Sequence, residues 1–98
     1  MDASESGSVV LDIGADIGAL IVYVPAAWHG REIEVSRGTD RRTHAAVRER
    51  HLEDGSIFCV VYPGLPEGDY TIWDDETTPG GTVTITGAEI TELDWTQR

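Results

Sequence analysis

The 98-residue sequence contains no lysine and no asparagine, and its only cysteine is Cys59. Any crosslink or reaction that needs a lysine amine is therefore excluded. With a single cysteine the chain cannot form a disulfide within itself. Because Phe58 and Val60 flank Cys59, we expect a buried thiol that packs as a small hydrophobic group.

Basic residues are also scarce, since seven arginines stand against eighteen acidic residues and the net charge is −11. A chain this acidic is a poor partner for nucleic acid or an anionic membrane, so neither is expected. The longest apolar run, residues 19–27, contains Pro25 and is too short to span a bilayer. The first residues lack the basic start and apolar stretch of a secretory signal. These absences predict a cytoplasmic protein.

The length and composition predict one folded domain. A chain of 98 residues can bury about 65% of its extended surface, which is enough for one core. Apolar residues make up 40% of the chain and charged residues 26%, the range of ordinary globular proteins. We expect residues 1–7 to form a flexible acidic tail, residues 8–95 a single domain and residues 96–98 a short C-terminal tail.

Short β-forming runs separated by glycine, proline and aspartate follow one another along the chain, without helical periodicity. Two of them, Ala19–Val24 and Ser56–Tyr62, are apolar on both faces, and the first is predicted to be a central strand. The last two strands are predicted to form a hairpin around Gly87 and Ala88. The pattern predicts an all-β, antiparallel β-sandwich of about seven to eight short strands, as in immunoglobulin-like domains. The predicted strands span residues 8–13, 19–24, 31–37, 43–50, 56–62, 69–74, 81–86 and 89–95.

The most specific motif begins at Phe58 and reads FCVVYPGLPEGDYTI. It resembles the F-x-x-L-P-x-G-x-Y-x-L signature of transthyretin-like (prealbumin-like) β-sandwiches, as in carboxypeptidase-regulatory-like and Cna-B-type domains. The stretch 83–93, a strand, a glycine turn and a second strand, is similar to the end of that family's chains. In the motif, Gly68 allows a sharp turn, and Tyr70 is expected to bury its ring while its hydroxyl bonds to the backbone.

The resemblance implies a fold and brings no catalytic residues with it. Cna-B-type domains are often locked by an isopeptide bond that starts from a lysine, and this chain has none. Transthyretin-related hydrolases resemble this fold and use histidine and arginine in a groove between subunits, with a Tyr-Arg-Gly-Ser tail. This chain ends in Trp-Thr-Gln-Arg instead. Hydrolase activity therefore remains an alternative, although the chain lacks the tail motif of those enzymes.

Few residues in the sequence are candidates for catalysis or metal binding. His29, His44 and His51 do not have a spacing that brings metal ligands together, so we expect exposed histidines without a metal. Ser36 and Ser56 have no neighbouring histidine and aspartate that would make either serine a nucleophile. The sequence therefore predicts no catalytic residue, no metal site and no cofactor, and the chain is not expected to be an enzyme.

Two tryptophans are the aromatic candidates for a partner contact. Trp28 is predicted in a loop, and Trp73 on the strand side opposite Tyr70 and Ile72. Large rings at such places often anchor interfaces. The alternative for these rings is that they complete the core.

Arginines form the second candidate. Arg42, Arg48 and Arg50 share one side of the predicted strand 43–50 and would form a basic stripe. The alternative is a cross-strand ladder with Glu32 and Glu34 of the preceding strand. Together with the two tryptophans, the stripe predicts a non-catalytic protein-binding or assembly module that binds a protein partner or itself. A small-ligand or carbohydrate-binding module and a transthyretin-related hydrolase are the alternatives.

Overall fold

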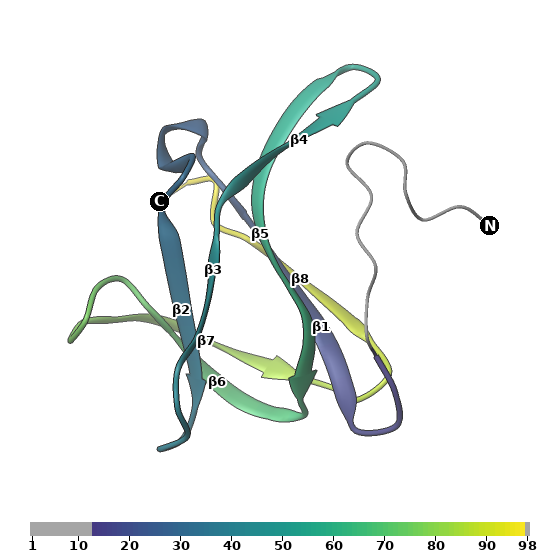
Figure 1. Cartoon of the computed structure of the whole chain (residues 1–98), viewed down its shortest axis with the longest axis vertical. Coiled ribbons are helices and arrows are strands. Elements are labelled where there is room, and N and C mark those ends of the chain that lie inside the picture. Colours follow the sequence, from purple (N-terminus) through teal and green to yellow (C-terminus); the bar gives the residue numbers. More distant parts are fainter. Residues whose placement is uncertain (1–12, 98) are drawn as a thin grey trace.

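The computed structural model describes residues 13–97, which form eight β-strands and one short 3₁₀ helix (Figure 1). Two four-stranded sheets pack against each other, so the predicted β-sandwich is confirmed. Within residues 13–97 there is no α-helix, and no helix is long and apolar enough to cross a membrane. The predicted tail 1–7 and the predicted strand 8–13, apart from its last residue, lie outside the described residues. The elements are β1 (Ile17–Val24), η1 (Ala26–Trp28), β2 (Glu32–Arg37), β3 (Thr43–Ala46), β4 (Arg48–Leu52), β5 (Gly55–Pro66), β6 (Gly68–Trp73), β7 (Pro79–Ile85) and β8 (Ile90–Asp94).

The first sheet has the strand order β4-β5-β1-β8, and the second has the order β3-β2-β6-β7. The apolar strands β1 and β5 lie side by side at the centre of the first sheet, as predicted for Ala19–Val24. All pairs are antiparallel except β1 and β8, which run parallel (Figure 1). The sandwich is therefore mostly, and not wholly, antiparallel.

The predicted hairpin at Gly87 and Ala88 is wrong, because β7 belongs to the second sheet and β8 to the first. The turn packs on the chain just before β1. A Cβ added to Gly87 would clash with the Ala15 carbonyl oxygen, and the Ala88 N–H donates to the Ile17 carbonyl at 2.9 Å. Ala88 also has a positive φ of 64°. The turn thus directs β8 to the free edge of β1 and away from β7.

The predicted strand 43–50 is also corrected, because it breaks at Val47. This residue is buried, its N–H donates to the Arg31 carbonyl at 2.8 Å, and its carbonyl accepts from the Gly30 N–H at 3.1 Å. At this point the chain leaves the second sheet, where β3 pairs with β2, and enters the first, where β4 pairs with β5. The basic stripe therefore does not exist as one feature, since Arg42 lies by the second sheet and Arg48 and Arg50 lie in the first.

Strand β5 is longer than predicted and runs on to Pro66, so the predicted loop 63–68 shrinks to the single residue Glu67. The pairing with β1 is irregular between Gly18 and Leu20, opposite the Pro63 region. Since β4 pairs only with residues 55–59 of β5, the missing N–H of Pro63 costs no bond on that side of the strand.

The core fills the space between the sheets with alternate residues of each strand. Each such side chain contributes about 1.5–3 kcal/mol through its burial. The largest fully buried side chains are Leu20, Val22, Ile33, Val35, Val47, Val60, Tyr62, Ile72 and Ile85.

Two tyrosine hydroxyls bond to backbone carbonyls. The Tyr70 hydroxyl donates to the Pro66 carbonyl at 2.6 Å, which confirms the role predicted from the motif. The Tyr62 hydroxyl donates to the Ile33 carbonyl and so connects β5 of the first sheet to β2 of the second. Burial raises the pKa of both hydroxyls above the ordinary tyrosine value, so both stay protonated and able to donate.

Candidate functional site

The outer side of the first sheet is unusually apolar for a sandwich surface. Alternate residues of β1 and β5 fill the core, and the residues between them point outward. Leu52 and Ile90, which are 54% and 47% exposed, flank them and account for two of the three exposed large hydrophobic residues in 13–97. We call this surface the apolar face, and it consists of Ile21, Tyr23, Leu52, Ile57, Val61 and Ile90.

The strand registers fix which residues share a row across the apolar face, since directly paired residues point to the same side. Arg48 of β4 pairs with Cys59 of β5, which pairs in turn with Tyr23 of β1. Tyr23 pairs with Asp94 of β8. One row therefore begins with an arginine, crosses two apolar strands and ends with an aspartate.

Opposite charges border the apolar face on its two sides. Strand β4 contributes Arg48 and Arg50, and β8 contributes Glu92 and Asp94. Within residues 13–97 no ion pair joins either arginine to a carboxylate, and Arg50 Nε is buried without a hydrogen-bond partner. The Thr96 hydroxyl and N–H donate to Asp94 Oδ1 at 2.6 and 2.9 Å. These bonds hold the pKa of the Asp94 carboxyl below its usual range, so it is charged at neutral pH.

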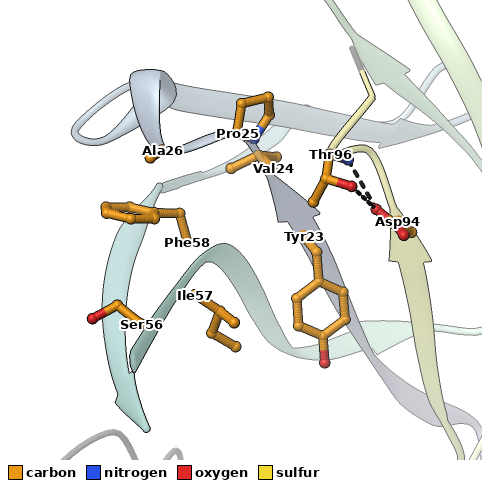
Figure 2. A pocket seen from close by; sticks show the side chains of 9 residues that line it. All are labelled: Tyr23, Val24, Pro25, Ala26, Ser56, Ile57, Phe58, Asp94 and Thr96. Carbon is orange, nitrogen blue, oxygen red and sulfur yellow. Dashed lines mark hydrogen bonds between the residues drawn. The ribbon is translucent and has the colours of Figure 1, made fainter. Parts of the chain in front are cut away.

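A pocket of about 480 Å³ opens at one end of the apolar face, where β1 ends and β5 begins (Figure 2). Tyr23 and Ile57 belong to both the pocket and the face, so the two form one continuous surface. Pro25 and Phe58 add further apolar wall, and the Asp94 carboxylate forms part of the polar side. The volume is in the range that binds a small ligand or the side chains of a partner.

Trp28 packs largely against its own chain. Its ring stands edge-on to Trp95, with 6.4 Å between the ring centroids, and the Arg31 guanidinium lies over it at 4.1 Å. The ring also packs against the hydrophobic core. The structure therefore supports the core-completing alternative for Trp28 and Trp95, and a partner contact by Trp28 stays an untested prediction.

Trp73 points outward from the second sheet, as predicted, and takes part in a polar cluster. Its indole N–H donates to Ser36 Oγ at 2.9 Å, and the Arg42 guanidinium lies 3.8 Å above its ring. Arg42 also pairs with Glu34 at 2.8 Å and donates to the Glu76 carbonyl at 2.6 Å. This confirms the glutamate-ladder alternative for Arg42, while a partner contact by Trp73 or Arg42 stays untested.

We expect Trp73→Phe and Ser36→Ala each to lower the free energy of unfolding by about 0.5–1.5 kcal/mol, because each removes the same indole–hydroxyl hydrogen bond. The double variant should cost less than the sum of the two single losses. Urea unfolding of the four chains measures this. Strictly additive losses would show that the two side chains do not depend on each other.

The structure does bring one serine, one histidine and one acid together, on the β4–β5 hairpin. Ser56 Oγ lies 3.5 Å from His51 Nδ1, and Glu49 Oε2 lies 3.9 Å from the same nitrogen. A catalytic triad needs the serine and the acid on opposite ring nitrogens, so this group cannot relay a proton. His29 lies beyond η1 and packs edge-on against Phe58 of β5, with 5.4 Å between the ring centroids, and His44 lies on β3. In the described part of the chain no three metal-ligating residues gather to hold an ion.

No family model, curated protein or solved structure matches the chain. Of the sequence-predicted contacts, Arg48 and Arg50 border the apolar face, and Trp28, Trp73 and Arg42 do not. The apolar face itself was not predicted as a site. Its signal was present in the sequence as the two strands that are apolar on both faces.

Proposed function

We propose that this chain is a non-catalytic protein-binding module whose contact surface is the apolar face. The observation that carries the proposal is the pairing of β1 and β5, which places outward-pointing Ile21, Tyr23, Ile57 and Val61 next to one another at the centre of a sheet. A sheet with one solvated side normally carries polar residues there. Contiguous apolar patches with a polar rim are typical of protein interfaces.

The charges around the apolar face favour a protein over the other partner classes. Arginines border one side and carboxylates the other, so the surface offers both signs to a partner. A net charge of −11 disfavours nucleic acid and anionic membranes. The only cysteine, Cys59, is buried and unpaired, which fits our further proposal that the module works in the cytoplasm.

We also propose that the fold is transthyretin-like. The sandwich architecture and the hydrogen bond from Tyr70 to the Pro66 carbonyl support this proposal. The carbohydrate-binding alternative has less support, because Arg42 covers one face of the Trp73 ring. The hydrolase alternative would need histidine and arginine to gather in a groove between subunits.

A photo-crosslinker tests the proposed surface. We expect Tyr23→p-benzoylphenylalanine, irradiated in the cells that make the chain, to give a protein adduct in high yield, because position 23 lies at the centre of the apolar face. The matched control is the same replacement of Thr82, which is exposed on β7 of the opposite sheet. Equal adduct yields from both positions, or none from position 23, would contradict the proposal.

A further inference from the structure

We propose that the partner of the apolar face is a second copy of this chain, packed face to face in a two-fold symmetric dimer. This inference rests on the proposed function and names its partner. It is carried by the arrangement of charge, which makes the face complementary to itself.

The complementarity follows from the strand order β4-β5-β1-β8. The basic strand β4 and the acidic strand β8 are the two edges of the sheet, and the apolar strands lie between them. When such a face is turned over onto itself about an axis parallel to the strands, each edge meets the opposite edge of the other copy. The basic edge then lies over the acidic edge on both sides, and apolar residues meet at the centre.

The row across the sheet makes this geometry specific. A rotation about an axis that runs along the strands, midway between β5 and β1, keeps every residue at its own height along the strands. Arg48 and Asp94 share one row, so each Arg48 comes to lie over Asp94 of the second copy. Arg50 lies two residues further along β4 and Glu92 two residues in the other direction along β8, so only Arg48 and Asp94 face each other directly. Tyr23 lies in the middle of that row and packs against the middle of the same row of the second copy, where Cys59 is already buried within its own chain.

A two-fold arrangement with its axis across the strands is unfavourable. An axis that lies in the interface but runs across the strands would place β4 over β4 and β8 over β8. Arg48 and Arg50 would then face the same arginines, and Glu92 and Asp94 the same carboxylates, which costs electrostatic energy at both edges. The charges therefore favour the axis along the strands over the axis across them, and with this axis the strands of the two sheets run nearly aligned, as in other packed sheets.

The face is small for a protein interface. Four strands spaced about 4.8 Å apart and paired over five to seven residues, each rising about 3.3 Å, give a face of roughly 20 by 20 Å. Two such faces bury about 1,000 Å² in total, the low end of specific interfaces. We therefore expect a reversible dimer with a dissociation constant of about 10–100 µM.

Charge reversal tests the orientation. We expect Arg48→Asp alone and Asp94→Arg alone each to weaken self-association at least tenfold, because each places like charges over each other twice per dimer. An equimolar mixture of the two variants should form a one-to-one dimer, since both contacts between the two different chains then join opposite charges. Sedimentation velocity at about 200 µM measures this, a concentration above the expected dissociation constant. The matched control, Arg41→Asp, makes the same charge change at an exposed residue between β2 and β3 and should dimerise like the original chain.

Folding of the variants is checked separately by circular dichroism, because Asp94 also accepts bonds from Thr96. If Asp94→Arg lowers the melting temperature, Glu92→Arg on the same edge replaces it and leaves those bonds intact. Single variants that dimerise like the original chain, or a mixture that stays monomeric, would overturn the proposed orientation.

The outcomes separate the two proposals. If the original chain stays monomeric up to about 1 mM, far above the expected dissociation constant, self-association is wrong. The crosslink from position 23 then decides the proposed function: an adduct with a different protein leaves a protein-binding face with another partner. The absence of any adduct removes both proposals. An adduct with twice the mass of the chain, together with the mixed dimer, supports both.

Discussion

Replacing Tyr62 with alanine is expected to cost about 4–6 kcal/mol of folding free energy, a large part of the roughly 5–15 kcal/mol that stabilises a domain of 98 residues. Tyr62 is 2% exposed and is the largest fully buried side chain among the described residues. Its removal leaves a large cavity between the sheets. It also leaves the buried Ile33 carbonyl without the hydroxyl that bonds to it, which adds about 1–3 kcal/mol.

The matched control is Tyr62→Phe, which keeps the ring and removes only the hydroxyl. We expect it to cost about 1–3 kcal/mol, because the ring still fills the core while the Ile33 carbonyl loses its donor. Urea unfolding followed by tryptophan fluorescence measures both variants. An alanine variant as stable as the phenylalanine variant would show that Tyr62 does not fill the space between the sheets.

Replacing Val61 with aspartate is expected to weaken dimerisation by about 100-fold and to change the stability of the monomer little. Val61 is partly exposed at the centre of the apolar face, so an isolated chain can solvate a carboxylate there. In the dimer the same carboxylate would be buried against apolar groups without a partner, which costs about 2.7 kcal/mol or more.

Sedimentation velocity measures this second effect, and thermal melting confirms that the variant folds. The matched control is Thr82→Asp, which places the same charge on the exposed side of the second sheet. We expect the control to dimerise normally. If Val61→Asp dimerises as well as the original chain, the apolar face is not the interface.

Local patterns predicted much of the fold. The fully apolar run of β1 predicted a central strand, and alternation along β6 predicted that Trp73 points outward and Tyr70 inward. These features depend only on which side chains of one strand are apolar and which are polar. They can therefore be predicted from a short stretch of sequence.

Features that depend on distant segments were missed. The break at Val47 is set by hydrogen bonds to Gly30 and Arg31, some sixteen residues away along the chain, and the parity of a single strand carries no sign of them. The parallel pairing of β8 with β1 likewise depends on the contact of Gly87 with the chain before β1. For this reason the basic stripe, which assumed one straight strand, was predicted wrongly.

The candidate site was predictable only in part. The sequence shows that β1 and β5 are each apolar on both sides. It does not show that they are neighbours, because their paired residues Val24 and Phe58 lie 34 positions apart. Only the pairing turns two apolar strands into one surface, and only the edge positions of β4 and β8 give it opposite charges on its two sides.

The central claim is that a second copy of this chain covers the apolar face. The most direct test is NMR of the 98-residue chain with a soluble paramagnetic probe, which reports how accessible the methyl groups of Ile21, Ile57 and Val61 are to solvent. The chain is measured at about 20 µM and at about 1 mM, below and above most of the expected range of the dissociation constant. We expect strong relaxation at the low concentration and protection at the high one, while the methyl groups of Thr82 and Thr84 stay accessible throughout. If the methyl groups on the apolar face are protected equally at both concentrations, a single chain covers this face itself. If they stay accessible at both concentrations, no second copy covers the face. Either result contradicts the dimer.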